Sequence, residues 1–405
     1  MKTVMVIPTY WAREKKIGYK RGDAIYDHPT PLDEEGTLKR VIDSIQILRQ
    51  TDFDLVIIGV ATSPDIELQV EKKIKGIVKR IKTQIKASVF SHSQLENITG
   101  FLNSKGKMEF VDLLQLKGYA NVRNLCLIIP QLLSCQVVVL IDDDEIFEDP
   151  DFIRKAREFL KEDLDSEKIY AKAGYYLTPE GGYLLRREIS PWMTYWNKIG
   201  WMNQAFEKYI GTEPRLKKTP FVFGGNMVIC KEIFSRIPFD PSITRGEDID
   251  YLMNANMFGY DFYLDNQLSI KHDPPPKSHP EWRRLREDIH RFVFSRRKIQ
   301  LQSSVVGMRK ITAEMFDPYP GNFLKHDLNK LIFRSNLMLG TKYLAEGDPE
   351  GYKECMRNIY LSQADFDPKS DPFKEFVNLQ KRWEKLMEFL GEEKVKSEIL
   401  KVISL

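Results

Sequence analysis

The sequence lacks long hydrophobic runs and has few cysteines. No stretch reaches the roughly 18 consecutive apolar residues that a membrane-spanning helix needs. The four cysteines (Cys126, Cys135, Cys230 and Cys355) are scattered, and their spacing fits neither a metal site nor a disulfide framework. A net charge of +3 is too small to indicate a nucleic-acid partner. Because the first residues lead directly into an apolar segment, we expect a soluble, cytoplasmic protein without a transmembrane segment.

Periodicity predicts an α/β protein. With 405 residues, of which 42% are hydrophobic, the chain is long enough for one large domain and a smaller appendage. Short apolar runs at 3–8, 55–60, 85–90 and 137–141 alternate with helical patterns that begin near residues 36, 64 and 121. This order predicts a mostly parallel sheet flanked by helices, with ligands beyond the carboxyl ends of the strands.

The last part of the chain has helical patterning throughout. Asp371 and Pro372 mark a helix start, an apolar stripe follows, and Gly391 marks the stop. We therefore expect a domain at 1–300 that carries the site and a helical C-terminal domain at 301–405. The latter would pack on the first domain or on another subunit, which makes its helices a candidate surface for a homo-oligomer.

The most informative segment is the acidic cluster after the strand at 137–141. Asp142, Asp143, Asp144 and Glu145 follow an apolar strand directly, so the sheet edge must hold their charges close together. That arrangement is costly unless a cation lies among them, and a hard divalent ion with oxygen ligands is the natural candidate. The alternative is an acidic turn that only starts the next helix.

A second acidic group, with Glu247, Asp248 and Asp250, lies at the start of a predicted helix. A carboxylate there could act as a general base, although acids also favour a helix amino terminus through its dipole. Upstream, Gly225 and Asn226 begin a strand at which a backbone could approach a ligand closely. The alternative for this pair is a glycine bulge that serves packing.

Three further segments have two interpretations each. The loop at 9–35 is long and rich in aromatic residues, which is typical of ligand contact but also of a surface insertion. The aromatic residues at 191–209 could stack on a sugar ring or form a core or dimer contact. The basic helix at 282–297 could bind pyrophosphate or another phosphorylated ligand, or lie peripherally on an anionic membrane, or be a solvated face.

Four motifs in order resemble glycosyltransferases of the GT-A (Rossmann-like) fold, in particular the large inverting family 2-like group. They are VMVIPTY at 4–10, GYANVRN at 118–124, IDDDE at 141–145 and RGEDIDYLMNANMFGYDFYLD at 245–265, and they span about two thirds of the chain. The resemblance implies a nucleotide-sugar donor and a divalent metal cofactor, Mg²⁺ or Mn²⁺, that stabilises the leaving pyrophosphate.

The resemblance also assigns roles to residues. Asp248 would be the catalytic base with Glu247 beside it, and Asp144, Asp142 and His272 would hold the metal ion. The nucleotide-sugar-binding residues would be Pro8, Tyr10, Arg123, Asn124, Asp142, Asp143, Gly225 and Asn226.

The predicted function is transfer of a sugar to a hydroxyl of a small soluble acceptor, such as a phosphorylated polyol, with inversion. The loop DHPTPLDEEGTL resembles, faintly, mannosyltransferases that use GDP-mannose to make mannosylated inositol-phosphate solutes. One alternative is a retaining GT-A transferase, which shares several of these motifs. Another is a nucleotide-sugar-binding module without turnover that acts through its helical end as a partner-binding protein.

Overall fold

The structure is a computed structural model, and it describes residues 1–80, 84–164, 166–276, 279–364, 366 and 368–403. Its strands are β1 Thr3–Ala12, β2 Thr30–Pro31, β3 Asp54–Ala61, β4 Lys86–Phe90, β5 Val137–Leu140, β6 Glu145–Ile146, β7 Asp163–Leu164, β8 Glu167–Lys168, β9 Ala171–Leu177, β10 Leu216–Lys218, β11 Met227–Cys230 and β12 Phe262–His272.

Its α-helices are α1 Leu38–Ile45, α2 Glu67–Val78, α3 His92–Ser104, α4 Tyr119–Leu132, α5 Phe152–Arg157, α6 Lys198–Tyr209, α7 Lys231–Phe234, α8 Glu247–Met257, α9 Glu281–Gln300, α10 Leu328–Ala345, α11 Pro349–Ala364, α12 Pro372–Gly391 and α13 Glu393–Ile403. Short 3₁₀ turns occur at Pro64–Ile66, Met108–Leu113, Pro191–Thr194, Ala313–Phe316 and Gly321–Phe323.

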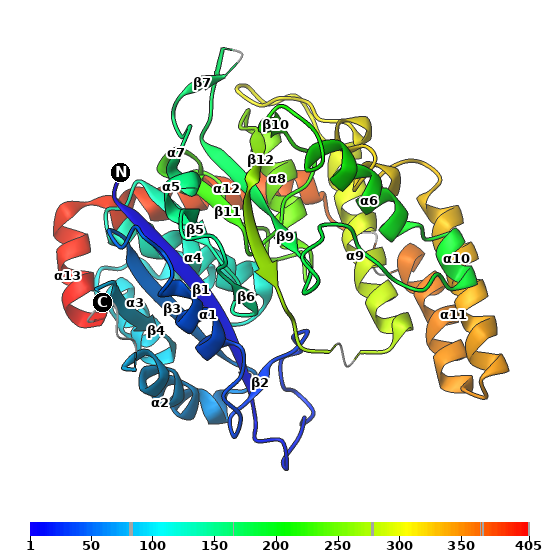
Figure 1. The fold of residues 1–405 in the computed structure, drawn as a ribbon, viewed down its shortest axis with the longest axis horizontal. Helices are drawn as coiled ribbons and strands as arrows, with labels where there is room; N and C mark the ends of the chain where they lie inside the picture. Colours follow the sequence, from blue (N-terminus) through cyan, green and yellow to red (C-terminus); the bar gives the residue numbers. More distant parts are fainter. Residues whose placement is uncertain (81–83, 165, 277–278, 365, 367, 404–405) are drawn as a thin grey trace.

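One large mixed sheet forms the centre of the molecule, which confirms the predicted α/β class (Figure 1). The strand order is β10-β12-β9-β11-β5-β1-β3-β4. β4, β3, β1 and β5 are parallel neighbours, whereas β11 runs antiparallel to both β5 and β9. The mostly parallel part brings the carboxyl ends of β1 and β5 to the same edge of the sheet, where ligands of such folds bind.

Both faces of this sheet are covered. Along β1, Val4 and Val6 belong to one buried apolar cluster and Met5 and Ile7 to another, as the alternation of side chains in a strand requires. Helices α1, α2 and α5 contribute to the second cluster, and α3, α4, α8 and α12 contribute to the first. Near-continuous apolar strands are typical of a sheet buried on both faces, and this explains why they were legible in the sequence.

The C-terminal region is helical, as predicted, and α12 starts at Pro372 and ends at Gly391. The N-cap residue of α12 is Asp371, whose side chain accepts hydrogen bonds from the backbone N–H groups of Phe373 and Lys374. α12 contacts α4 and α9, while α13 contacts α3, so the last helices pack on the helices of the sheet. α10 and α11 lie at the opposite end of the molecule from both chain termini (Figure 1). The domain boundary at 300 stays a prediction.

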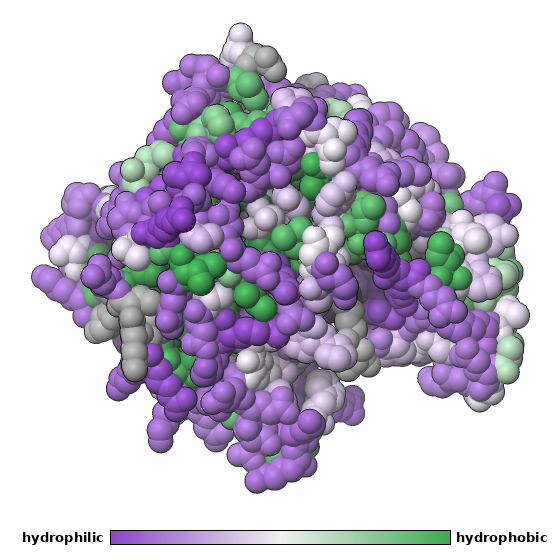
Figure 2. All heavy atoms as spheres, in the orientation of Figure 1, coloured by the Kyte–Doolittle hydropathy of each residue, from purple (hydrophilic) through white to green (hydrophobic). Residues whose placement is uncertain are grey.

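The outer surface in the view of Figure 2 is largely hydrophilic, with hydrophobic residues in small separate groups. No helix among the described residues is both long and apolar enough to cross a membrane. The four cysteines are buried and free, as predicted.

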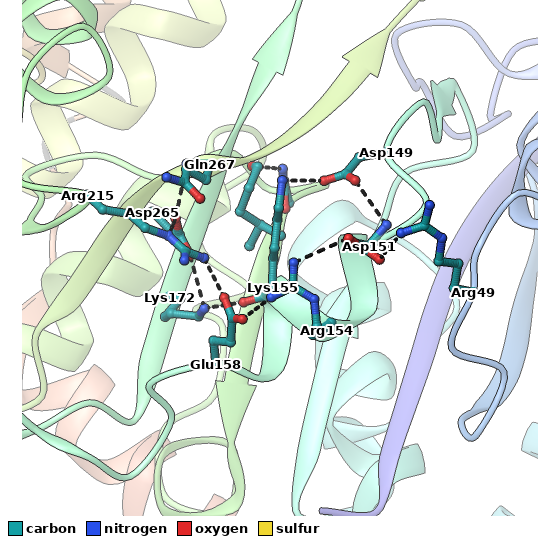
Figure 3. Close-up of polar contacts among 12 residues, drawn as sticks. Arg49, Asp149, Asp151, Arg154, Lys155, Glu158, Lys172, Arg215, Asp265 and Gln267 are labelled. Atoms are coloured by element: carbon teal, nitrogen blue, oxygen red, sulfur yellow. Dashed lines mark hydrogen bonds and ion pairs between the residues drawn. The ribbon is translucent and has the colours of Figure 1, made fainter.

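A buried lysine on β9 is an unexpected feature of the core. Lys172 is fully buried, and its Nζ lies 3.3 Å from Oδ2 of the equally buried Asp265 on β12 (Figure 3). Asp265 also accepts two hydrogen bonds from Arg215, at 2.7 and 2.9 Å. Burial lowers the pKa of Lys172 to about 8. The carboxylate therefore compensates two cations, whereas the lysine depends on one carboxylate.

This asymmetry predicts different effects of removing each partner. Asp265→Asn leaves a buried lysine without its counter-ion and should lower the free energy of unfolding by about 3–5 kcal/mol. Lys172→Met keeps Asp265 paired with Arg215 and fills the same space, so it should cost much less. Chemical denaturation followed by circular dichroism measures both. Equal destabilisation by the two changes would contradict this account.

Candidate active site

The acidic cluster lies where β5 ends. Asp142, Asp144 and Glu145 each offer an oxygen, and these oxygens all lie within 4.8 Å of one another. The Asp142 backbone N–H donates to Oε2 of Glu145 at 3.0 Å, so the turn closes on itself. Gly225 lies against this turn, because a Cβ at that position would collide with the carboxylates of Glu145 and Asp142. The close backbone approach predicted for this glycine therefore exists, and it is an approach to the acids.

Two histidines flank Asp144. Oδ2 of Asp144 lies 2.9 Å from Nε2 of His28 and 3.3 Å from Nε2 of His272. His272 arrives there by register, since it is the last residue of β12 and pairs with Glu145 on β6. Although burial opposes ionisation, these two histidines hold the pKa of Asp144 well below its usual range. Burial also opposes the charge on His28, but its contact with Asp144 raises the pKa of that imidazole.

The residues present fit a divalent cation. Oε1 of Glu145 is buried and has no hydrogen-bond partner, and burial followed by the charges of Asp142 and Asp144 raises the pKa of Glu145 well above its usual value. A buried carboxylate oxygen without a partner is costly unless a proton or a cation satisfies it. Asp142, Asp144 and Glu145 could hold such an ion, so the structure adds Glu145 to the predicted set. His272 touches Asp144, and its role as a ligand stays a prediction.

Asp143 lies between the predicted metal-binding residues and contacts β1. Its Oδ2 accepts a hydrogen bond of 2.6 Å from the hydroxyl of Thr9, which follows Pro8 on that strand. Burial, with the neighbouring charge of Asp144, raises the pKa of Asp143 to about 7. β1 extends to Ala12, so part of the predicted loop at 9–35 is strand, and this extension places Thr9 and Tyr10 beside the acids.

Arg123 joins the two acidic groups. Its guanidinium lies 2.6 Å from Asp142 and 3.4 Å from Glu247, and the residue is only 5% exposed. Its Nη1 is buried without a partner, which leaves a donor for an anionic ligand. Arg123 is therefore a buried partner of two carboxylates and not a surface cation.

Asn124, predicted to contact the nucleotide, has a different environment. Its side chain donates to the backbone oxygen of Phe239 at 2.9 Å and accepts from the Phe239 N–H at 2.8 Å. Asn226 is also buried and donates to the backbone oxygens of Leu268 and Tyr175. Neither asparagine is among the described residues that line the cavity below, and both tie segments of the backbone together.

The second acidic group starts α8, as predicted. Gly246 precedes it in the left-handed conformation (φ +73°), and a Cβ there would collide with Arg291. Asp248 accepts hydrogen bonds from the backbone of Gly224 at 3.1 Å and of Ile249 at 2.8 Å. Burial raises the pKa of Asp248, and burial raises the pKa of Glu247 to about 7 against the opposing charge of Arg123. These shifts suit groups that exchange protons near neutral pH.

Most of these groups line one cavity of about 300 Å³. Of the predicted site residues, it is lined by Pro8, Tyr10, Arg123, Asp142, Asp143, Asp144, Glu247, Asp248 and His272. Three tyrosines form one wall: the ring centroid of Tyr10 lies 4.4 Å from that of Tyr26 and 5.2 Å from that of Tyr119. Such a wall can receive a flat ring by stacking.

Sequence reasoning missed several lining residues. His28 and Tyr26 lie in the long loop at 9–35, whose sequence does not show which of its residues reach a ligand. Helical spacing alone does not reveal that Arg291 of α9 reaches the cavity. Lys198 and Tyr319 likewise line it from distant segments. The sequence does show that the helix at 282–297 is basic and includes Arg291. It does not show which face of this helix lines a cavity.

Comparisons with known proteins give structural similarities alone. No protein-family model matches the chain, and no curated protein sequence does. Among solved structures, the mannosyltransferase PcManGT of Pyrobaculum calidifontis in complex with GDP-Man and Mn²⁺ aligns with 99% of this chain and 87% of its own, at 10% identity and a TM-score of 0.43. GalNAc-T7 with UDP, GalNAc and Mn²⁺ aligns with 83% of this chain and 55% of its own, at 12% identity and a TM-score of 0.36.

A mycobacterial protein aligns with 72% of each chain, at 14% identity and a TM-score of 0.38. At these identities and TM-scores, the similarities bear on neither the donor nor the acceptor of this protein. The proposed function below therefore rests on the geometry of the site.

The hydrogen bonds of Asn124 predict a structural role. Asn124→Ala should lower the free energy of unfolding by about 2–4 kcal/mol, because it leaves two buried backbone groups of Phe239 unpaired. Binding of a nucleotide to the folded protein should be unchanged. Chemical denaturation and nucleotide titration at a temperature where the variant is folded separate the two effects. A stable variant that no longer binds nucleotide would restore the ligand-contact role.

Proposed function

We propose that the protein is a metal-dependent glycosyltransferase that moves a sugar from a nucleotide diphosphate donor to a hydroxyl of an acceptor, with inversion. The observation that carries this proposal is that one cavity is lined by Asp142 and Asp144 of the carboxylate cluster, by a buried arginine with a free donor, and by two acids at the start of α8. Sugar transfer from such a donor needs each of these three parts.

The first two parts serve the leaving group. A divalent ion held by Asp142, Asp144 and Glu145 would supply Lewis-acid stabilisation of the departing pyrophosphate. Arg123 would hold a further phosphate oxygen through the Nη1 donor that has no partner in the protein. The wall of Tyr10, Tyr26 and Tyr119 offers stacking for the nucleobase on the β1 side of the acids.

The third part serves the acceptor. Asp248 would accept the hydroxyl proton while the oxygen attacks the anomeric carbon opposite the leaving group. The Gly224 and Ile249 amides fix its carboxylate, and the buried setting raises its pKa, which makes it a stronger base than an exposed aspartate. Glu247, paired with Arg123, would remain beside it as an acceptor contact. A single base of this kind supports inversion.

Within this class we propose GDP-mannose as the donor, on the resemblance of the loop DHPTPLDEEGTL to mannosyltransferases. Its histidine, His28, touches Asp144, and its Asp27 pairs with Arg245 at 2.6 Å, so this loop forms part of the cavity wall. The acceptor would be a small molecule with a hydroxyl group.

The metal and donor sites predict a linked stabilisation. Nucleotides and nucleotide sugars, tested with and without Mn²⁺ or Mg²⁺, should raise the melting temperature only when metal and the matching nucleotide are both present. Asp144→Asn should abolish the shift, whereas Asp151→Asn, which removes the same charge next to α5 outside the cavity, should retain it. Absence of any shift in the wild-type protein would favour a function without nucleotide sugars.

The base predicts a separation of binding from turnover. Asp248→Asn should bind metal and donor as the wild-type protein does but lose roughly 10²–10⁴-fold in rate, because the acceptor proton has no recipient. Slow hydrolysis of the bound donor, with water in place of the acceptor, provides the assay, and the anomeric configuration of the released sugar by NMR tests inversion. If Asp248→Asn keeps full activity, another residue is the base. If the released sugar keeps the anomeric configuration of the donor, the retaining alternative is favoured.

A further inference from the structure

A second and larger cavity lies beside the first. Its volume is about 750 Å³, compared with about 300 Å³ for the cavity at the acids. Tyr176, Lys198, Phe206 and His272 line both, so the two cavities are neighbours that share a wall. A molecule in the larger cavity would therefore lie next to the proposed metal and donor site.

Much of the wall of this larger cavity is apolar. Leu185, Trp192, Met193, Trp196 and Leu285 line it. Trp192 and Trp196 are mostly buried, at 7% and 3% exposure, and the indole nitrogen of each has no hydrogen-bond partner. Buried indole nitrogens usually find a partner, so these two donors are available to a ligand. The aromatic segment at 191–209 thus serves both core packing and the cavity.

Cations outnumber carboxylates among the residues of this wall, and one of these cations, Arg245, is paired with carboxylates outside it, Asp27 at 2.6 Å and Glu287 at 2.7 Å. Its cationic residues are Arg186, Arg187, Lys198, Arg245 and Arg284, while the carboxylates among its described residues are Glu281 and Asp288. Both carboxylates are already engaged. Glu281 pairs with Arg187 at 3.0 Å and with Lys342 at 2.8 Å. Asp288 pairs with Lys198 at 2.8 Å and with Arg291 at 2.8 Å.

Arg284 and the exposed Arg186 are the cations of this wall that these pairs leave without a carboxylate, and Arg284 is the more buried of the two. It forms no ion pair with any carboxylate in the described parts of the chain, and its Nε is buried without a hydrogen-bond partner. Burial and the positive charge of Arg187 lower the pKa of Arg284 against the opposing charge of Glu281. A partly buried cation without a carboxylate partner of its own is costly unless an anion joins it. The guanidinium fork matches phosphate oxygens in pairs.

Resting on the proposed function, we propose that the larger cavity binds the acceptor and that the acceptor is a phosphate ester with an apolar body. Its phosphate group lies at Arg284, with Arg187 and Arg245 completing the charge. Its apolar part lies against Trp192, Trp196 and Leu285, and its hydroxyl reaches the smaller cavity. A purely polar phosphorylated polyol would leave these apolar walls unmatched, so the cavity narrows the acceptor class given above.

Binding of octyl phosphate tests this proposal, since the compound carries only the two groups that the cavity is expected to recognise. Below its critical micelle concentration, it should bind the wild-type protein in calorimetry, while inorganic phosphate and octyl glucoside should each bind at least about tenfold more weakly. Arg284→Gln should raise the Kd for octyl phosphate roughly tenfold or more. Arg283→Gln, a matched change at a neighbouring residue of α9 outside both cavities, should leave it unchanged.

Vesicles distinguish a lipid phosphate from a soluble ester. If the protein binds octyl phosphate but does not sediment with vesicles of phosphatidylcholine and phosphatidic acid, the acceptor is a soluble ester. If it sediments with these vesicles and Arg284→Gln abolishes sedimentation, the acceptor is a lipid. Both outcomes support the phosphate site. Absence of octyl phosphate binding, or equal loss in Arg284→Gln and Arg283→Gln, overturns it. If the protein shows the metal-dependent nucleotide shift but fails this test, only the acceptor assignment falls. Octyl phosphate binding without any nucleotide shift would instead refute the transferase.

Discussion

The contact on which the rest of the site depends is the pair of ion contacts made by Arg123. This guanidinium belongs to a residue that is 5% exposed. It lies between Asp142, in the turn after β5, and Glu247, the first residue of α8. Without it, two groups of buried carboxylates would face each other across one cavity, and their repulsion would favour protonation or separation. One buried cation thus allows the acids after β5 and the acids at the start of α8 to lie close together.

The contacts of Asp144 follow the same logic. The register of β12 against β6 brings His272 to this carboxylate, and the long loop brings His28 to the same oxygen. Both imidazoles compensate a charge that burial alone would oppose. The strand pairing and the loop therefore position the acid that the proposed metal ion requires.

The parts of this site that could be predicted from sequence are those fixed by local pattern. The apolar run 137–141 predicted a strand that delivers Asp142 and Asp144 to the sheet edge, and the helical period after Glu247 predicted the start of α8. His28 and Arg291 depended on which distant segments meet, and no local pattern encodes that. Asn124 and Asn226 show the converse limit: the resemblance assigns them to the nucleotide sugar, whereas in the structure their amides hydrogen-bond buried backbone groups of Phe239 and Leu268.

Helix α9 ties the two cavities together. Arg284, Asp288 and Arg291 lie on one face of it, since residues three, four and seven positions apart are neighbours on a helix. Arg291 lines the smaller cavity, Arg284 lines the larger one, and Asp288 pairs with both Arg291 and Lys198 between them. The sequence left three interpretations of this basic helix: a solvated face, a membrane contact or a phosphate site. In the structure, the environment of each basic residue depends on the helix face on which it lies. Those on this face line the two cavities, whereas Arg286, on another face, is held by Glu354 of α11. The packing of α11 against α9 thus engages one of its cations and leaves Arg284 to the proposed acceptor site.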